Sequence, residues 1–297
     1  MRHLSSPGRR RLLRQALAVP LTTRLAGGPF AALAESTVWH RRMRLNLGFR
    51  NPHAYRLSAQ RFWCYLPVGP TATQRLTAVQ VSTEYRLLQD RLAHNILELG
   101  FDSFSAYAHK QIHVTCEAEL RATVEAGSVA GNEDWLRPEA YVESDDPAIR
   151  QQAETLRRES PAASARAIYD WVRSNLTYAG YIAPDLGARY ALEARRGDCT
   201  EFAGLVVALA RALGIPARVI GGYVTEQDLV LRANAYHNWA EILFDGAWRI
   251  LDAQKGNWCA SPQIYVGFRI HHHDPVNVLG TAHRYRIEGE ILVEIGT

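Results

Sequence analysis

One helix constrains the fold of this chain more than any other segment, and residues 199 to 213 predict it. After Cys199 the apolar side chains recur at helical spacing. They are Phe202, Leu205, Val206, Leu209, Ala210 and Leu213. Small and branched apolar residues fill the other sides, so we expect a helix that is buried nearly all round. Gly214 and Pro216 end it, the first as a left-handed cap and the second because proline cannot continue a helix.

The start of this helix is marked as clearly as its end. Asp198 is a suitable N-cap and Glu201 occupies the third helical position, which is a variant of the capping box. Cys199 is then the first helical residue, where free backbone N–H groups and the helix dipole favour an anion. We therefore expect a lowered thiol pKa and a place that can receive an oxyanion. Because the carboxylates of Asp198 and Glu201 oppose a thiolate, a partner histidine is needed.

A predicted hairpin supplies that histidine. The dipeptide Asp245-Gly246 lies between two strand-like runs and is a strong signal for a two-residue turn. Counting outward from such a turn places Trp239 opposite Asp252. His237 shares a face with Trp239, so His237 and Asp252 are diagonal neighbours, roughly 7–8 Å apart at the backbone. A three-residue turn would move one partner to the other face.

These three residues suit nucleophilic catalysis. Cys199 would attack a carbonyl, His237 would hold the thiolate as an ion pair and then protonate the leaving amine, and Asp252 would fix the tautomer of the imidazole. A lone cysteine among apolar residues is usually a buried thiol, and a lone strand histidine is usually structural. The position of Cys199 at a helix start, with His237 and Asp252 together on one hairpin face, favours the catalytic interpretation.

Four pieces of the sequence resemble the transglutaminase-like superfamily in the family's own order. They are Gly197-Asp198-Cys199 before an apolar helix, Gly214-Ile215-Pro216-Ala217-Arg218, His237-Asn238-Trp239-Ala240-Glu241, and the strand from Trp248 to Asp252. The family contains transglutaminases, peptide N-glycanases and many bacterial cysteine peptidases with a papain-like core. The resemblance spans roughly residues 145 to 255. It implies that Cys199 is the nucleophile, His237 the base and Asp252 the third member. The family often continues Asp-Pro-Thr after the acid, whereas Ala253-Gln254 follows here.

The remainder of the chain predicts an α+β protein. Residues 36–125 alternate apolar and polar side chains in several runs, which indicates a β-sandwich-like amino-terminal domain, and the resemblance also implies such a domain. Residues 126–147 are polar and acidic and indicate a linker. Residues 148–297 form the predicted papain-like, transglutaminase-like core, with a helix over 163–176. Alternating runs near 264–268 and 284–295 predict strands that join the core sheet or return to the first domain.

Two aromatic residues and one loop are further candidates for the site. Tyr178 follows the helix over 163–176, and the fold implied by the resemblance makes it a candidate to assist the oxyanion, although such a tyrosine is more often packing. Trp239 is expected to shield the catalytic face or to belong to the plain core. Residues 181–196, with Pro184 and Gly187, are expected to form a loop that shapes the cleft.

Residues 1–34 predict an export signal of the twin-arginine type that is removed, so we expect a periplasmic protein. The alternative is a disordered basic arm. Loss of its six arginines takes the formal net charge from +4 to −2, which removes any argument for nucleic acid binding. No later run has the roughly 18 to 20 apolar residues of a membrane span.

The remaining cysteines and histidines are expected to lie outside the chemistry. Cys64 and Cys116 both face the inside of their strands, so they form a disulfide in an oxidising compartment or stay as buried thiols. Cys259 has no obvious base. Consecutive histidines alternate in direction, and no suitably spaced ligand joins His271-His272-His273, so we expect no zinc site and no cofactor.

The expected function is cysteine-dependent hydrolysis of a peptide or protein amide through a thioester. Acyl transfer to an amine differs only in the second nucleophile and stays open. A non-catalytic scaffold that retains the fold is the third possibility. The sequence fixes neither the substrate nor the oligomeric state.

Overall fold

A computed structural model describes residues 37–121 and 132–296. The predicted export signal and residues 126–131 of the predicted linker lie outside the described residues. The described residues form one compact unit. Among the described helices, none has the length and apolar character that a membrane span requires.

The amino-terminal strands alternate as the sequence predicts. They are β1 (Val38–Arg50), β2 (Leu57–Leu66), β3 (Gln74–Val81), β4 (Arg86–Gln89), β5 (Asn95–Phe104) and β6 (His109–Arg121). β1, β6 and β3 belong to one sheet, and β2, β5 and β4 to a second. The inward side chains of both sheets share one apolar core. Phe49 of β1 meets Phe62 of β2 edge to face, with ring centroids 5.1 Å apart.

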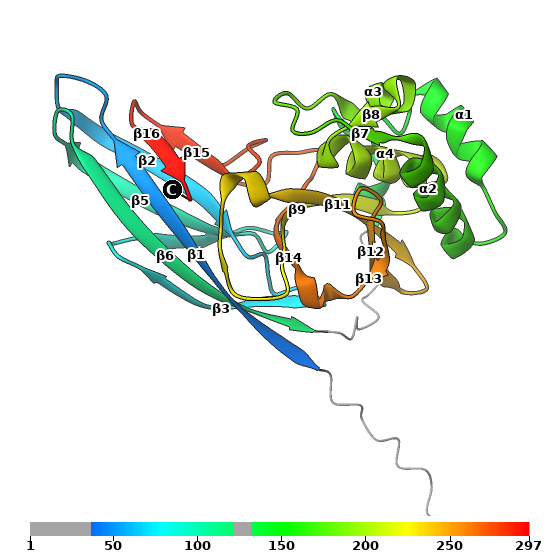
Figure 1. Ribbon diagram of the computed structural model, residues 1–297, viewed down its shortest axis with the longest axis horizontal. Coiled ribbons are helices and arrows are strands. Elements are labelled where there is room, and N and C mark those ends of the chain that lie inside the picture. The colour runs from blue at the N-terminus through cyan, green and yellow to red at the C-terminus, as the bar shows by residue number, and fades with distance from the viewer. Residues whose placement is uncertain (1–36, 122–131, 297) are drawn as a thin grey trace, which may run out of the picture. The chain divides into compact units, whose positions relative to one another are not determined.

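The end of the chain returns to these two sheets, which is one of the two alternatives left open by the sequence. β15 (Tyr285–Glu288) pairs antiparallel with β2, and β16 (Leu292–Ile295) pairs antiparallel with β1. β10 (Leu229–Val230) pairs parallel with β1 along the same edge as β16, opposite β6. Segments from both ends of the described chain therefore build the sandwich (Figure 1).

The core sheet has the order β13-β12-β11-β9-β14. Its strands are β9 (Ala217–Val224), β11 (His237–Phe244), β12 (Ala247–Asp252), β13 (Asn257–Ala260) and β14 (Tyr265–Ile270). Short 3-10 turns, η1 (Asn132–Leu136), η2 (Ala233–Ala235) and η3 (Pro262–Ile264), connect these parts. Two-residue strands β7 (Thr177–Tyr178) and β8 (Arg196–Gly197) form a parallel pair next to the helices.

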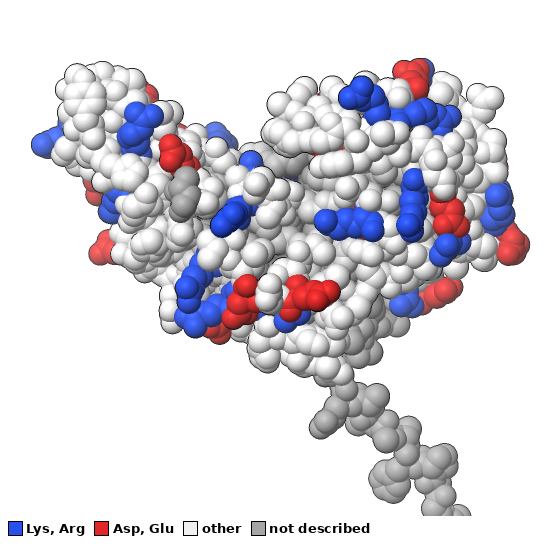
Figure 2. Space-filling model, viewed as in Figure 1, with Lys and Arg blue, Asp and Glu red and all other residues white. Residues whose placement is uncertain are grey.

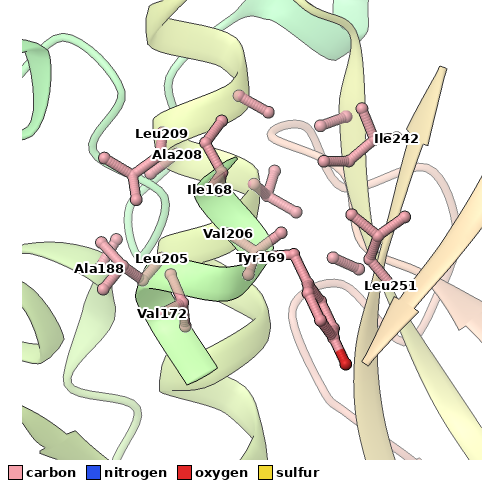
Figure 3. Packing of buried hydrophobic residues seen from close by; sticks show 14 of the residues in the cluster. Ile168, Tyr169, Val172, Ala188, Leu205, Val206, Ala208, Leu209, Ile242 and Leu251 are labelled. Carbon is pink, nitrogen blue, oxygen red and sulfur yellow. The ribbon is translucent and has the colours of Figure 1, made fainter. Parts of the chain in front are cut away.

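Four helices form one layer beside the core sheet (Figure 1). They are α1 (Pro147–Leu156), α2 (Pro161–Asn175), α3 (Gly187–Ala194) and α4 (Cys199–Ala212). α4 is the predicted central helix, and every residue from Glu201 to Arg211 is buried. Figure 3 shows why: Ile168 and Val172 of α2 lie against α4, and Tyr169 of α2 lies between the helices and Leu251 of the sheet. The predicted α+β fold class is confirmed.

α3 corrects the prediction that residues 181–196 form a loop throughout. Its helix begins at Gly187, whose φ of +87° lets the chain turn directly into the helix. Ala188, Ala191 and Leu192 are spaced like one helical face and are buried against the α4 layer. The proline and glycine that suggested a loop therefore mark only the entrance to a short helix.

The hairpin of β11 and β12 has the predicted two-residue turn. Asp245 and Gly246 both have positive φ, 51° and 72°, as a type I′ turn requires. Phe244 is paired with Ala247, and the ladder runs on to Ala240 and Leu251. The predicted register is confirmed, and Asp252 follows directly at the end of β12.

The face of the core sheet away from α4 is joined to the sandwich. Gln74 of β3 is buried and donates from Nε2 to the carbonyl oxygens of Val68, at 2.6 Å, and Gly267, at 2.8 Å. Its Oε1 accepts from the N–H of Gly267 at 2.9 Å. A cavity of about 610 Å³ lies beside this contact and is lined in part by Trp239 and Tyr265. On the molecular face in Figure 2, positive and negative side chains are interspersed.

Candidate functional site

The start of α4 is the capping box that the sequence predicts. Asp198 accepts from the N–H of Thr200 at 2.7 Å, and Glu201 accepts from the N–H of Asp198 at 2.9 Å. Gly197 makes room for this arrangement, because a Cβ at this position would lie 2.3 Å from Cβ of Glu201. Cys199 is held as the first residue of the helix.

The second oxygens of the same two carboxylates hold the segment before α3. Asp198 Oδ2 accepts from the N–H of Ile182 at 3.0 Å, and Glu201 Oε1 accepts from the N–H of Leu186 at 3.0 Å. Asp185 of this segment is also 2.7 Å from Nε2 of His283. The acids beside Cys199 thus fix the 181–186 segment in place, a role that the spacing of the sequence did not reveal.

His237 and Asp252 meet as the hairpin register predicts. Nε2 of His237 is 2.7 Å from Oδ2 of Asp252, and both side chains are buried. A carboxylate only accepts, so the hydrogen-bond network assigns the imidazole proton to Nε2. Nδ1 of His237 is then left as the nitrogen able to take up a proton.

Asp252 is itself held on both oxygens. Tyr265 donates its hydroxyl to Oδ2 at 2.9 Å, and the N–H of Lys255 donates to Oδ1 at 3.0 Å. Asn257 donates to the tyrosine oxygen at 2.8 Å. With a side chain only 1% exposed, Asp252 keeps one orientation, which is what a group that orients an imidazole needs.

Cys199 lies beside the residue that follows His237. Asn238 points its Nδ2 toward Sγ of Cys199, 4.0 Å away, and donates to Oγ1 of Thr200 at 2.9 Å. The first residues of β11 and the first turn of α4 are therefore in contact. Through Asn238, which directly follows His237, Cys199 lies at the same end of β11 as the histidine that contacts Asp252.

The thiol pKa departs from the prediction. Burial raises the pKa of Cys199 to about 11, the negative charge of Asp198 adds to this, and only the hydrogen bond from Asn238 opposes it among the leading causes. The expectation of a lowered pKa is wrong in direction, because burial and nearby carboxylates outweigh the helix end. At neutral pH the residue rests as a thiol and must lose its proton to a base as it attacks.

Tyr178 and Trp239 take different places. Tyr178 is paired with Gly197, is half exposed, and burial followed by the charge of Cys199 raises its pKa. Trp239 is buried and lies parallel to the His237 ring, with centroids 6.4 Å apart and planes at 27°. Its other neighbour is Tyr265, met edge to face at 5.0 Å. Tyr178 is thus a half-exposed residue near the start of α4, and Trp239 is a buried one that lies against the imidazole.

The other cysteines are not part of this site. Cys64 and Cys116 are free, buried thiols in the sandwich, and burial raises the pKa of both. Cys259 is an exposed free thiol on β13. Of the two alternatives for Cys64 and Cys116, the structure has the unbridged one.

Comparison with known proteins agrees with this fold. Residues 150–253 match the family model of the transglutaminase-like superfamily. This segment is a transglutaminase-like core. It contains α2 to α4, the catalytic candidates and the hairpin, while the sandwich strands other than β10 lie outside the matched range.

One solved structure extends the similarity of fold to most of the chain. A candidate cysteine protease from Cytophaga hutchinsonii has a TM-score of 0.60 at 19% identity, over 87% of this chain and 91% of that one. The periplasmic domain of TgpA from Pseudomonas aeruginosa has a TM-score of 0.40 at 17% identity, over 70% and 86%. An uncharacterised protein of Mycobacterium leprae is 27% identical over 121 residues, which is 39% of this chain. The matched region spans only 43% of that relative's length.

Several residues of the transglutaminase-like core were missed by reasoning from sequence. Asn238 and Thr200 flank the thiol, and Tyr265 with Asn257 holds Asp252. Alternation along β11 was a usable signal for Asn238, because its side chain must face away from those of His237 and Trp239, toward α4. No local sequence signal indicated that Tyr265 contacts Asp252, because the two residues are separated in the chain by β13.

Proposed function

We propose that this chain is a cysteine-dependent hydrolase that cleaves a peptide or related amide bond. Cys199 is the nucleophile, His237 the general base and acid, and Asp252 the group that orients the imidazole. The observation that carries the proposal is the 2.7 Å contact between Nε2 of His237 and a carboxylate that Tyr265 and Lys255 also hold. A buried carboxylate held in this way keeps Nδ1 free for proton transfer.

The first half of the reaction forms a thioester. Because the thiol pKa is raised to about 11, Sγ transfers its proton to Nδ1 of His237 as it attacks the carbonyl carbon. The backbone N–H of Cys199 offers a donor for the developing oxyanion, since the capping box already uses the N–H groups of Thr200 and Glu201. Tyr178 is a second candidate donor, since its half-exposed ring lies near the thiol. The imidazolium then gives its proton to the leaving amine.

The second half of the reaction hydrolyses the thioester and regenerates the free enzyme. A water gives its proton to Nδ1, its oxygen attacks the thioester carbon, and Sγ leaves and recovers a proton from the imidazolium. An amine that replaces water would give acyl transfer with the same protein groups. The acceptor that reaches the thioester decides between the two outcomes, and the 181–186 segment that Asp198 and Glu201 hold is positioned to control that access.

A panel of amides tests the proposal. Cell-wall peptides and protein amides are incubated with the wild type, with Cys199→Ala, and with Cys259→Ala as a matched loss of an exposed thiol. We expect turnover in the wild type and in Cys259→Ala, and none in Cys199→Ala. Free acid as the main product in the presence of a primary amine supports hydrolysis, whereas an amine adduct supports transfer.

A non-catalytic scaffold that retains the fold would give a different result in this panel. No turnover of any amide, together with no thioester on Cys199 in the wild type, contradicts catalysis. The twin-arginine pattern of residues 1–34 also leads us to propose export to the periplasm, which processing of that segment in cells would support.

A further inference from the structure

The histidine run at residues 271–273 has an acidic partner that is far away in the sequence. Asp134 of η1 lies beside His272 and His273, and one ligand atom from each of the three residues falls within 4.8 Å of the others. Oδ2 of Asp134 is 3.6 Å from Nε2 of His272. Two ligands of a tetrahedral Zn²⁺ are about 3.4 Å apart for metal–ligand distances of 2.0–2.2 Å, so this pair is already near that spacing.

The two histidines do not alternate in direction as the sequence predicts. β14 ends at Ile270, so the following residues leave the extended conformation that separates neighbouring side chains. The rings of His272 and His273 have centroids 4.0 Å apart and planes at 34°. The loop thus turns two imidazoles toward the same place, and Asp134 joins them from the other side.

The nitrogen atoms of His273 lack the partners that buried nitrogens normally have. The side chain is only 8% exposed, and both ring nitrogens are buried without a hydrogen-bond partner among the described residues. Nε2 does lie 2.9 Å from Oδ2 of Asp274, in a geometry that is not a hydrogen bond. Leaving buried polar atoms unpaired costs free energy, and a bound cation would satisfy one of them.

His272 can present a lone pair to the same point. Its Nδ1 is 3.2 Å from the carbonyl oxygen of Asp274 and accepts a 3.1 Å hydrogen bond from the N–H of that residue, which the tautomer used for metal binding must give up. The tautomer that donates from Nδ1 to the carbonyl leaves Nε2 free to bind a metal. A histidine that binds a metal usually donates its other ring N–H in this way.

A guanidinium group lies at the cluster. Arg91 Nη2 is 3.3 Å from Nε2 of His272, and Nη1 is 3.7 Å from Oδ2 of Asp134. The same two donor atoms therefore already attract a cation. Because the Arg91 side chain is 54% exposed, it can move into solvent when a metal binds. Arg137, 4.0 Å from Asp134, is a second and more distant positive charge.

We propose that Asp134, His272 and His273 form a Zn²⁺ site that ties η1 to the loop after β14. Two imidazoles and one carboxylate are a donor set that Zn²⁺ accepts, with water as the fourth ligand. The bound ion also fixes Trp135, which follows Asp134 and meets the His272 ring edge to face at 5.4 Å. The site is separate from Cys199, His237 and Asp252.

Zinc titration of the full chain tests the proposal. All proteins carry Cys199→Ala and Cys259→Ala, so that the two exposed or partly exposed thiols cannot bind the metal. Calorimetric titration with ZnCl₂ is expected to show one equivalent in this background. His273→Ala and Asp134→Asn are each expected to weaken binding at least tenfold, while His109→Ala removes an exposed imidazole of β6 and leaves the affinity unchanged.

Arg91→Ala is expected to change the zinc affinity in the opposite direction. Removal of the competing cation is expected to strengthen zinc binding several-fold, and zinc should raise the Tm of this variant and of the parent but not that of His273→Ala. Circular dichroism confirms that each variant is folded. Zinc affinity that is absent in the parent, unchanged by both His273→Ala and Asp134→Asn, or weakened by Arg91→Ala overturns the proposal.

Discussion

At the scale of single residues, the hydroxyl of Tyr265 is the contact that most directly tests how Asp252 orients His237. Tyr265→Phe removes the 2.9 Å hydrogen bond to Oδ2 and leaves the imidazole as the only side-chain donor to that oxygen among the described residues. We expect kcat to fall about tenfold with little change in KM, because orientation and not binding is lost, and stability to fall by about 1–2 kcal/mol. Steady-state kinetics on an amide found in the substrate panel measures the first effect.

Tyr65→Phe is the matched control for this change. Its buried ring also loses one hydroxyl contact, to Asn277 at 3.3 Å, but in the sandwich. A similar loss of stability with unchanged kcat is expected. Equal kcat values for the two variants would show that Tyr265 only packs.

The pKa of Cys199 has a residue-scale test of its own. Asp198 is the second-largest cause of the rise to about 11, and asparagine keeps an N-cap at this position. In Asp198→Asn the lost negative charge stabilises the thiolate, so the pKa falls. At pH 8, below the pKa, the thiolate fraction and the rate of alkylation by iodoacetamide should rise about three- to tenfold. An alkylation rate of Asp198→Asn that is equal to or lower than that of the wild type between pH 7 and 10 would contradict the assigned electrostatics.

At the scale of secondary-structure elements, the start of α4 depends on one glycine. Gly197→Ala places a Cβ 2.3 Å from Cβ of Glu201, so the capping box must open and Cys199 must shift. We expect a loss of about 1–3 kcal/mol in unfolding free energy and a large loss of activity. Gly100→Ala is the control, since its Cβ would meet nothing within 4 Å. Denaturant unfolding that gives the same free energy for both variants would refute this account of the helix start.

Elements whose signals are local were predictable from the sequence. The capping box at Asp198, the end of α4 near Gly214 and the turn at Asp245-Gly246 each depend on a few adjacent residues, and the hairpin register followed from the turn alone. α3 was missed because Pro184 and Gly187 suggested a loop, while the burial that stabilises the helix comes from α4. The contact of Asp134 with His272 and His273 had no signal in the spacing at all.

At the scale of the whole molecule, the chain passes from the sandwich to the core and back, and the two parts share buried contacts. β15 and β16 pair with β2 and β1 after the chain has completed the core sheet. The side chain of Gln74 carries three buried hydrogen bonds to Val68 and Gly267. Such interleaving couples the two parts, so we expect one cooperative unfolding transition.

Gln74→Ala tests this coupling. It removes the partner of the Gly267 N–H and of the Val68 carbonyl, at a cost of about 2–4 kcal/mol, while the Gly267 carbonyl still accepts from the N–H of Val68. Calorimetry should show a single transition at lower temperature, with sandwich and core lost together. Two transitions, one of them unchanged by the substitution, would show that the parts unfold independently.

The most direct test of the central claim is the rate at which Cys199 is acylated. A small activated ester such as p-nitrophenyl acetate is mixed with the wild type, His237→Ala and Cys199→Ala at pH 7.5, and peptide mapping by mass spectrometry locates the acetyl group. The account predicts one hydroxylamine-sensitive thioester on Cys199 in the wild type, formation at least a hundredfold slower in His237→Ala, and no thioester in Cys199→Ala. Acylation of Cys199 at the same rate with and without the imidazole of His237 would contradict it.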